Sequence, residues 1–387
     1  MQRLKYKKYQ RLFPPPKGSF FLFGPRGTGK TTLVEDLGLD SHSITLLDEE
    51  KFQAYLVRPS LFAEELERLE NGSWVFVDEI QRLPGLLNEV HRLIEKKRLK
   101  FAMTGSSARK LRRAGVNLLA GRAVSRRLYP LTPMEMGKDF DLDRALEIGT
   151  LPLIIQAEDP EDTLKAYVQT YLKEEIQAEA LVRNLAGFAR FLPIAAIHHA
   201  QTLNLANISR DAGVQRPTVQ GFFEVLEDTL LVRKLEPFSA RLRVREKKHP
   251  KFYFIDPGIV RTLKQARGRV TIEERGALFE GLVFTLLEFQ KDTFGEIDEL
   301  SFWSPAEARL TEVDFLVRKG NDFVAIEVKS AETLRPDDFR GLRAISDLKG
   351  LRRKILVYRG RTNRKTEDGV EVLTFNTFCR ELLNREI

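Results

Sequence analysis

The segment Gly24–Thr31, which reads GPRGTGKT, constrains the fold of this chain more than any other feature. It fits the pattern G-x-x-x-x-G-K-[ST] in full, and it stands between an apolar run, Ser19–Phe23, and a stretch with helical spacing, Lys30–Leu37. Glycines let backbone N–H groups turn inward around phosphate oxygens, and the start of a helix adds unpaired donors. The pattern therefore predicts a strand, a phosphate-binding loop and a helix that together bind ATP.

The positions of this loop have distinct expected roles. We expect Lys30 to contact the β- and γ-phosphates and the Thr31 hydroxyl to bind Mg²⁺. The residues expected to surround the nucleotide are Gly24, Pro25, Arg26, Gly27, Thr28, Gly29, Lys30, Thr31 and Thr32.

An acidic strand end supports the nucleotide interpretation. Trp74–Val77 is an apolar run, and Asp78 and Glu79 follow it directly. A strand of this kind places both carboxylates at the carboxyl edge of a parallel sheet, where ligands of open α/β sheets bind. We expect Asp78 to hold Mg²⁺ through water and Glu79 to polarise the water that attacks the γ-phosphate. The alternative is an exposed acidic strand end with no chemical role.

Two further residues are candidates for catalysis. Lys100–Met103 predicts a strand that lies between the acidic strand and the phosphate loop, so Thr104 at its end, or else Ser106, would sense the γ-phosphate. Arg122 is a candidate arginine finger, a residue that neutralises charge on the transferred phosphoryl group and often comes from a neighbouring subunit. A finger supplied in this way requires a homo-oligomer, and a hexameric ring is one such form.

Length and composition limit the class of protein. At 387 residues the chain is too long for one hydrophobic core, and a hydrophobic content of 42% with a charged content of 30% is that of an ordinary soluble globular protein. No apolar run is long enough to cross a bilayer and the N-terminus has no apolar signal stretch, so we expect no membrane association. The single cysteine, Cys379, excludes an internal disulfide framework and fits a cytoplasmic location.

The charge distribution favours a polyanionic partner. The formal net charge is +8, and basic residues concentrate in four stretches, residues 3–11, 109–127, 241–251 and 340–364. Each stretch alone is compatible with a solvated face, but four together make a phosphate backbone, and hence DNA, the expected partner.

The middle of the chain contains a helix-turn-helix pattern. A short helical stretch ends at Gly213, and a second one carries apolar residues at helical spacing after Pro217. The expected DNA contacts are Arg216 and Thr218 near the start of the second helix, and Arg243, Arg245 and Lys247 in the basic run beyond it. The alternative is a helical lid or contact surface that never touches DNA.

Near the C-terminus, two runs flank the tetrapeptide 319–322 and predict a β-hairpin with a two-residue loop at Gly320-Asn321. In that register one face is wholly apolar and brings Val313 opposite Val328, Phe315 opposite Ile326 and Val317 opposite Val324. On the other face Asp314 lies opposite Glu327, and Glu312 lies opposite Lys329.

Two facing carboxylates predict a cation. Their Cβ atoms would lie roughly 4.5–5.5 Å apart, which is unfavourable without positive charge between them, and Mg²⁺ suits oxygen ligands. We expect Asp314 and Glu327 to hold the ion together with Glu280 from an amphipathic helix, and Lys329 to stabilise charge. This set resembles the PD-(D/E)XK nuclease core, although Ser304-Pro305 does not supply the usual Pro-Asp pair. The alternative is a surface set of salt bridges.

The phosphate loop, VFVDEIQRLP at 75–84, TGSS at 104–107 and LAGR at 119–122 resemble a widespread prokaryotic family of AAA-type P-loop ATPases. The resemblance covers nearly the whole chain, since YFIDPG at 253–258 and the later EVDF and IEVK motifs are also similar to that family. It implies an α/β protein with a P-loop AAA-type domain, a helical lid with a winged-helix-like fold, and a mixed α/β domain resembling restriction endonucleases. The alternation of strands and helices in the first part predicts a parallel sheet. From the changes of pattern along the sequence we place the three parts at 1–140, 141–245 and 246–387.

Two functions of different class follow. The first is an ATP-driven machine that binds, remodels or translocates DNA, with a last domain that engages or cuts it. The second is a nucleotide-controlled switch that binds a protein or DNA partner without cleaving DNA, and in which hydrolysis only resets the switch. Strong stimulation of ATP turnover by DNA favours the machine.

Overall fold

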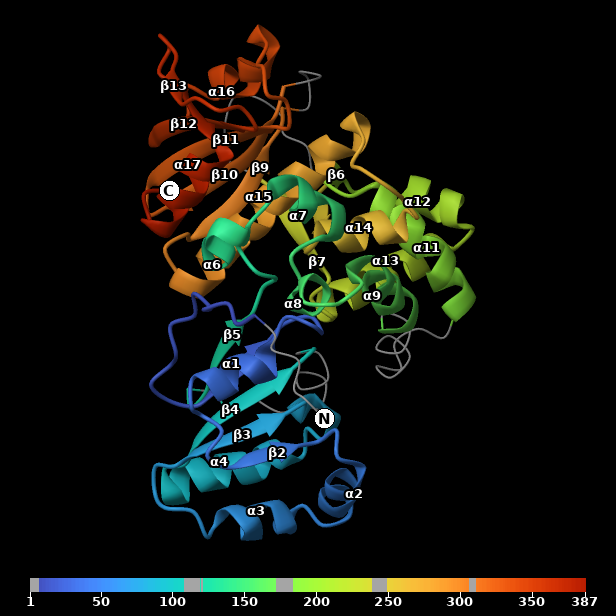
Figure 1. Cartoon of the computed structure of the whole chain (residues 1–387), viewed down its shortest axis with the longest axis vertical. Coiled ribbons are helices and arrows are strands. Elements are labelled where there is room, and N and C mark those ends of the chain that lie inside the picture. The colour runs from blue at the N-terminus through green and yellow to red at the C-terminus, as the bar shows by residue number, and fades with distance from the viewer. Residues whose placement is uncertain (1–6, 108–118, 120, 172–183, 239–248, 306–310) are drawn as a thin grey trace.

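The computed structural model describes residues 7–107, 119, 121–171, 184–238, 249–305 and 311–387. Its strands form two sheets at opposite ends of the molecule, with a group of helices beside the second (Figure 1). Within the described residues, no helix is both long and apolar enough to cross a membrane.

The first sheet is parallel and has the order β2-β3-β4-β1-β5. Its strands are β1 (Phe20–Phe23), β2 (Ser43–Thr45), β3 (Trp74–Asp78), β4 (Lys100–Gly105) and β5 (Val124–Arg127). β4 pairs with both β1 and β3, so it lies between the phosphate-loop strand and the acidic strand, as the sequence predicts. The predicted limits of these three strands agree with the structure to within two residues, whereas β5 is a strand that the sequence reasoning did not identify.

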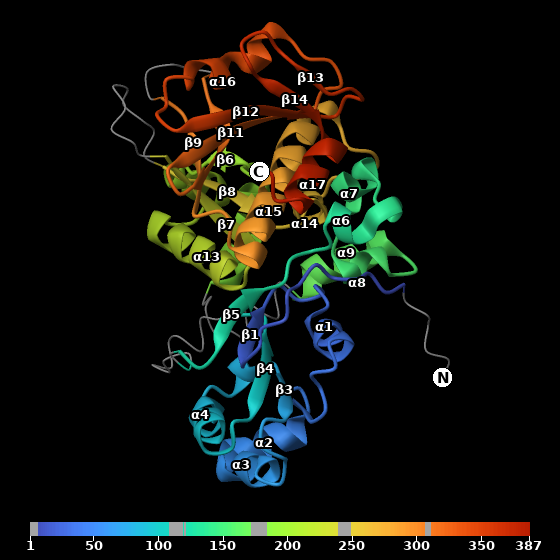
Figure 2. The ribbon, with the colours of Figure 1, turned by 90° about the vertical axis from the view of Figure 1, so that its left-hand side faces the viewer.

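Helices cover both faces of this sheet (Figure 2). They are α1 (Lys30–Asp36), α2 (Glu49–Val57), α3 (Ser60–Leu66) and α4 (Leu86–Lys97), with a short 3₁₀ turn, η1 (Ile80–Arg82), after β3. In β1, Phe21 and Phe23 pack with α3 and α4, whereas Phe20 and Leu22 pack with α1. The strand is therefore buried on both faces, which explains why its sequence is a continuous apolar run.

A group of helices follows the first sheet. They are α6 (Pro133–Met136), η2 (Gly137–Asp139), α7 (Leu142–Ile148), α8 (Pro152–Ile155), α9 (Pro160–Ala166), η3 (Tyr167–Tyr171), α11 (Leu185–Ile197), α12 (Leu205–Ala212) and α13 (Arg216–Asp228). A turn at Gly213, whose φ of 60° favours glycine, joins α12 to α13, and buried Val219, Phe222 and Leu226 fix α13 to the core. The two helices thus lie where the sequence predicts them, and a winged helix that binds DNA stays a prediction.

The second sheet has the order β13-β14-β12-β11-β10-β9-β7-β8-β6. Its strands are β6 (Gln201–Thr202), β7 (Val232–Pro237), β8 (Lys251–Phe254), β9 (Glu299–Trp303), β10 (Val313–Lys319), β11 (Asp322–Lys329), β12 (Leu351–Tyr358), β13 (Arg364–Lys365) and β14 (Glu371–Thr374). β7 pairs antiparallel with β8 and parallel with β9, so one sheet continues across the expected boundary at 245/246. The helical middle and the C-terminal part therefore contribute strands to one sheet. The three-part division stays a prediction.

The hairpin of β10 and β11 has the predicted register. Pairing runs from Phe315 opposite Ile326 to Lys319 opposite Asp322, around a loop in which Gly320 has a φ of 59°. A positive φ in a two-residue hairpin loop is the conformation that glycine adopts without strain.

Helices cover both faces of the second sheet as well (Figure 2). They are α14 (Pro257–Leu263), α15 (Ile272–Phe294), η4 (Pro336–Phe339), α16 (Arg340–Ala344) and α17 (Phe375–Leu383). α15 and α17 pack on one face of the hairpin and α16 on the other. Val313 departs from the prediction that it shares a face with Phe315, because it packs with the residues beneath α16. Between Val313 and Leu316 the pairing of β10 with β9 shifts register.

Asp256 ties the second half of the chain to the segment before α8. Its fully buried carboxylate accepts hydrogen bonds from the backbone N–H groups of Gly258 (2.9 Å), Ile259 (3.3 Å) and Thr150 (2.7 Å). Gly258 permits this approach, since a Cβ there would lie 2.2 Å from the carbonyl oxygen of Ile148. The chain between α7 and α8 is therefore held directly against the start of α14.

Replacing Asp256 with alanine should destabilise the fold more than an ordinary cap deletion. The change leaves buried backbone donors without an acceptor, so we expect the free energy of unfolding to fall by about 3 kcal/mol. Asp141→Ala is the matched control, because Asp141 accepts only from the N–H of Arg144 at an exposed helix start, and we expect a loss of about 1 kcal/mol. Urea unfolding of both variants measures the difference, and equal losses would contradict the role of Asp256.

Candidate nucleotide site and the C-terminal acid cluster

The phosphate loop connects the end of β1 to the start of α1. Gly27 and Gly29 have φ of 81° and 83°, which other residues adopt only with strain. The ammonium group of Lys30 is buried within the loop and donates to the carbonyl oxygens of Gly24 (2.8 Å) and Pro25 (3.2 Å). An ammonium group already inside the loop is placed to contact phosphate oxygens that enter it.

Asp78 lies beside the first turn of α1, at the carboxyl edge of the sheet. The Thr31 hydroxyl is 3.5 Å from its Oδ1, and the Thr104 hydroxyl donates to the same oxygen. Burial raises the pKa of Asp78 above its usual value, and the hydrogen bond from Thr104 partly offsets this effect. The structure therefore brings together the three side chains expected around Mg²⁺ and the γ-phosphate, and their catalytic roles stay predictions.

Glu79 follows Asp78 with a left-handed backbone, at a φ of 58°. Its backbone N–H donates to the Thr104 hydroxyl (3.3 Å), and its carboxylate accepts a hydrogen bond from the side-chain amide of Gln81. The same amide nitrogen lies 3.1 Å from the hydroxyl of Ser106, the second residue considered as a sensor. Gln81 is a residue that the sequence reasoning missed, and its only signal is its place two residues after Glu79.

Three groups from outside the first sheet hold the backbone of the phosphate loop. The N–H of Leu153 in α8 donates to the Gly27 carbonyl (3.2 Å), and the Tyr167 hydroxyl donates to the Arg26 carbonyl (3.1 Å). Arg11 donates to the Thr28 carbonyl (2.8 Å). The loop is thus in direct contact with the helical middle.

Arg11 differs from its expected role. It belongs to the basic N-terminal stretch that was expected to favour a polyanion, but its side chain is only 8% exposed and forms an ion pair with Glu135 at 2.9 Å. It also donates to the carbonyl of Tyr129. Its charge is therefore neutralised inside the protein, where it supports the phosphate loop.

Arg122 lies at the wrong edge of the sheet to act on a nucleotide bound to its own chain. It precedes β5, which runs parallel to β1, so it is level with the start of β1 while the phosphate loop follows the end. Four residues of strand separate the two edges by about 13 Å. Its guanidinium also pairs with Glu95. A finger role for Arg122 is compatible only with a neighbouring subunit.

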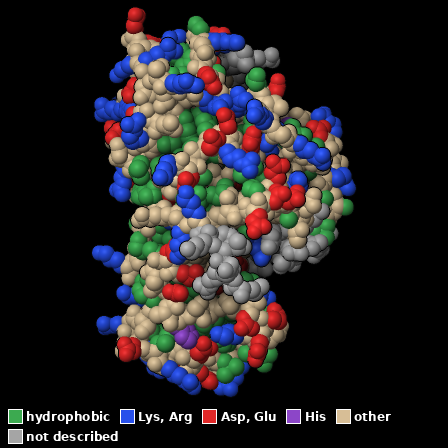
Figure 3. Space-filling model, viewed as in Figure 1, with side chains coloured by type: hydrophobic (Ala, Val, Ile, Leu, Met, Phe, Trp, Pro, Cys, Tyr) green, Lys and Arg blue, Asp and Glu red, His purple; other side chains and the backbone are tan. Residues whose placement is uncertain are grey.

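The expected DNA contacts lie partly outside the described residues. Arg216 is exposed and Thr218 half-buried at the start of α13, whereas Arg243, Arg245 and Lys247 fall in a segment that the structure does not describe. On the face shown in Figure 3, Lys and Arg side chains are interspersed with Asp and Glu. This face therefore shows no single basic patch.

The C-terminal acids form a cluster with a lysine at its centre. The ammonium group of Lys251 in β8 is 3.0 Å from Glu280 and 3.7 Å from Asp314, and it also pairs with Glu312. Lys329 pairs with Glu327. Lys251 belongs to a stretch expected to face DNA, but it is 4% exposed and lies among carboxylates.

Burial and charge act together in this cluster. Burial opposes the charge of Lys251, but its carboxylate neighbours, Glu280 foremost, outweigh that effect and hold its pKa well above the usual value. Burial raises the pKa of Glu280 to about 7, although Lys251 lowers it. Burial and the nearby Asp314 raise the pKa of Glu327 well above its usual value.

These residues do not fit the expected Mg²⁺ site. Across the described ranges, no group of three or more His, Cys, Asp or Glu side chains is arranged to hold a metal ion. The position between Glu280 and Asp314 is taken by the ammonium group of Lys251. The metal set Glu280, Asp314 and Glu327 is therefore corrected to an ionic cluster whose cations are lysines, and the predicted pairing of Glu312 with Lys329 is replaced by Glu312 with Lys251.

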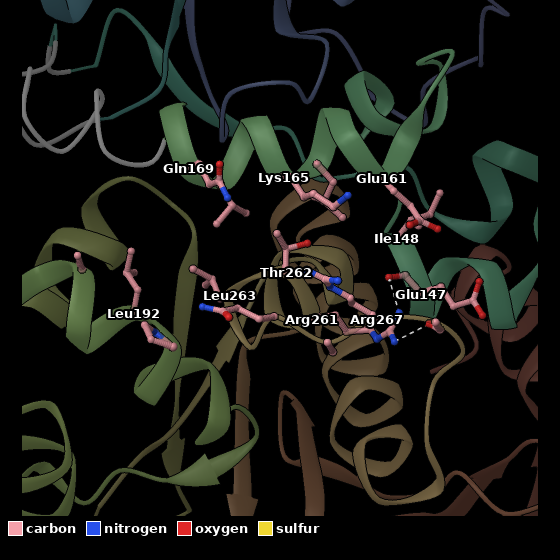
Figure 4. Close-up of a pocket in the computed structure, with 17 residues that line it drawn as sticks. Glu147, Ile148, Glu161, Lys165, Gln169, Leu192, Arg261, Thr262, Leu263 and Arg267 are labelled. Carbon is pink, nitrogen blue, oxygen red and sulfur yellow. Dashed lines mark hydrogen bonds between the residues drawn. The ribbon is translucent and has the colours of Figure 1, made fainter.

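A pocket of about 680 Å³ lies among α9, α11 and α14 (Figure 4). Its lining carries both charge signs, including Glu161, Lys165 and Arg267. Arg261, also in the lining, already pairs with Glu274 and donates to two backbone carbonyls. None of the lining residues belongs to the phosphate loop, so this pocket is separate from the nucleotide site.

Comparison with protein families divides the chain into three matched stretches. Residues 17–137 match a family described as "AAA domain". Residues 139–269 and 275–378 match families described as "Domain of unknown function (DUF8612)" and "Domain of unknown function (DUF4143)". The first match supports an AAA-type ATPase, and AAA ATPases generally use ATP with Mg²⁺.

The relatives and solved structures described next share less than 30% sequence identity with this chain. An uncharacterised protein of Mycobacterium tuberculosis, Rv2008c, is 28% identical over 349 residues, covering 88% of this chain and 76% of the relative. An uncharacterised protein of Haemophilus influenzae is 24% identical over 388 residues, covering 90% and 91%. The ORC1 protein of Aeropyrum pernix, solved in complex with DNA, is similar with a TM-score of 0.30 and 13% identity, covering 65% of this chain and 87% of that one. The protein VC1899 of Vibrio cholerae has a TM-score of 0.24 and 14% identity, covering 95% of each chain.

The acid cluster predicts unequal effects of its two lysines. Lys251→Met removes the central cation from buried carboxylates, so we expect the free energy of unfolding to fall by about 3–5 kcal/mol. Lys329→Met should cost less, because the Lys329 side chain is 30% exposed against 5% for Lys251. Thermal and urea unfolding in nucleotide-free buffer measure both. A stabilisation of the wild type by MgCl₂ that disappears in an Asp314→Asn variant would contradict the lysine-filled cluster.

Proposed function

We propose that the chain binds ATP with Mg²⁺ at Gly24–Thr31 and hydrolyses it, with Glu79 polarising the attacking water. The observation that carries the proposal is the convergence of Thr31, Asp78 and Thr104 at one sheet edge beside a buried lysine. A hydroxyl and a carboxylate beside incoming phosphates are the protein ligands that Mg²⁺ uses in phosphoryl transfer.

Each side chain then has one task. Lys30 exchanges its carbonyl partners for the β- and γ-phosphate oxygens, which carry more negative charge. Thr31 and Asp78 hold the Mg²⁺ that arrives with ATP, Asp78 through water. Thr104, bonded to Asp78 and to the backbone of Glu79, registers whether the γ-phosphate is present.

We further propose that the hydrolysis cycle is transmitted to the rest of the chain through the helical middle. Leu153 and Tyr167 contact the phosphate-loop backbone. The segment just before α8 is in turn held by Asp256 through Thr150. A shift of the phosphate loop on nucleotide binding therefore alters groups that reach α14 and the second sheet.

The partner that we propose is DNA. The net charge of +8 favours a polyanion, and Arg216 and Thr218 stand at the start of α13, where the helix dipole also favours phosphate. Cleavage by the C-terminal acid cluster is not part of the proposal, because Lys251 occupies the position that a metal ion would need.

A second candidate function is a nucleotide-controlled switch that binds a protein or DNA partner without cutting it. The acid cluster favours it, since Lys251 fills the space between Glu280 and Asp314 in the described structure. The effect of DNA on ATP turnover distinguishes the two functions. A DNA-remodelling ATPase should hydrolyse ATP faster when forked or single-stranded DNA is added. A switch should hydrolyse ATP slowly whether or not DNA is present.

We also propose a homo-oligomer, with a hexameric ring as one form. Arg122 lies at the edge of the sheet opposite its own phosphate loop, so only a neighbouring subunit's site is within its reach as a finger. Sizing a Glu79→Gln variant with and without ATP tests this. A monomer under both conditions would remove Arg122 from catalysis.

Two substitutions at the phosphate loop should separate binding from hydrolysis. Glu79→Gln should keep ATP affinity but lower kcat by about 10²–10⁴-fold, since it removes the group that takes the water's proton. Lys30→Ala should lose both affinity and turnover, because its ammonium group contacts the phosphates in the ground state. Equilibrium binding of a fluorescent ATP analogue and phosphate release measure the two quantities, and unchanged turnover in Glu79→Gln would remove Glu79 from the mechanism.

Charge reversal on α13 should weaken DNA binding. We expect Arg216→Glu to reduce affinity for duplex and forked DNA and to lower the slope of log affinity against log salt by about 1. Arg144→Glu, on α7, is the matched control with the same change of net charge and should leave that slope unchanged. Fluorescence anisotropy over a salt series measures both. Identical slopes in the two variants would exclude α13 as the DNA contact.

A further inference from the structure

The side-chain amide of Gln81 links the two sides of the candidate catalytic site. It is 4% exposed, it donates to Oε2 of Glu79, and its nitrogen is 3.1 Å from the hydroxyl of Ser106 at the end of β4. Glu79 follows β3 and Ser106 follows β4, so the amide spans neighbouring strand ends. None of the roles proposed above uses it.

The orientation of this amide follows from its partners. A carboxylate only accepts hydrogen bonds, so the amide nitrogen and not the oxygen must face Glu79. The amide oxygen is then directed at Gly105, where a Cβ would lie 2.5 Å away, and it has no hydrogen-bond partner. A methionine would fill the same space without a buried unpaired acceptor, so packing alone does not call for an amide here.

We propose that Gln81 is a positioning residue for Glu79 in ATP hydrolysis. Resting on the proposed function, the inference is that the amide fixes Oε2 of Glu79 and leaves Oε1 to accept the proton of the attacking water. Because the same nitrogen is anchored to Ser106, the carboxylate is held toward β4, the strand between the acidic strand and the phosphate loop.

The end of β4 also touches the phosphate loop, which connects the amide to the nucleotide. The carbonyl of Gly105 accepts the N–H of Gly24, the first residue of the loop, at 3.3 Å. Ser106 follows Gly105 directly. The anchor that orients Glu79 is therefore one residue from a contact with the loop that surrounds the phosphates, so the position of the carboxylate depends on the geometry of the loaded site.

The test is the effect of Gln81→Met on kcat and on ATP affinity. The variant keeps the length of the side chain and removes its donors. Since a misplacement of about 1 Å lowers rates by about 10²-fold, we expect kcat to fall by about 10–100-fold with the Kd for ATP changed less than about threefold. Ser106→Ala removes the anchor only and should lower kcat in the same direction by a smaller factor. Gln53→Met, at an exposed position that bonds Glu49, is the matched control and should match the wild type.

A double-mutant cycle separates this inference from the proposed function. If Glu79→Gln hydrolyses ATP as fast as the wild type, the proposed function fails. If Glu79→Gln is inactive while Gln81→Met and Ser106→Ala keep the wild-type kcat, only the role of Gln81 fails. A rise of kcat in Gln81→Met would also overturn the positioning role, because the amide would then hold Glu79 in an unproductive orientation. Gln81→Met should add nothing in the Glu79→Gln background, since both act on one step.

Circular dichroism and thermal unfolding show whether a variant has a low kcat only because it does not fold. If Gln81→Met does not fold, Ser106→Ala decides the question, because it leaves Gln81 in place and removes only the hydroxyl that holds it. A kcat of Ser106→Ala equal to that of the wild type would then overturn the proposal, and a lowered kcat at unchanged Kd would support it.

Discussion

The conformation of the phosphate loop is the constraint on which the rest of the structure depends. Gly27 and Gly29 adopt positive φ angles so that the backbone can turn around the ammonium group of Lys30. The next three carbonyl groups of the loop accept hydrogen bonds from Tyr167, Leu153 and Arg11. The same turn that creates a phosphate site thus creates the surface on which the helical middle packs.

The described part of the second half of the chain contains several buried ion pairs. Lys251 stands where neighbouring carboxylates converge, and Arg233 in β7 pairs with Glu288 and Asp292 of α15. Asp292 also accepts from Arg127, the last residue of β5 in the first sheet. Ionic contacts of this kind cross from one sheet to the other, so they join the two ends of the molecule in addition to the helices that contact the phosphate loop.

The sequence predicted what local periodicity controls and missed what distant strands bring together. The β10–β11 register followed from a two-residue loop and alternating apolar residues, and the strands around the phosphate loop followed from apolar runs. Lys251 was misassigned because its basic neighbours suggested a surface; the pairing of β8 with β7 that buries it spans a segment of the chain that carries no register signal. Gln81 was missed because its function depends on Ser106, whose proximity arises only when β3 and β4 pair.

A buried lysine among the C-terminal carboxylates supplies different chemistry from a metal ion. A divalent cation lowers the pKa of bound water and polarises a phosphodiester, whereas an ammonium group supplies only charge and hydrogen bonds. Lys251 is held by several carboxylates at once, so displacing it would leave both the lysine and the acids unpaired in a buried site. The carboxylates therefore stabilise the junction of β8, β10 and α15.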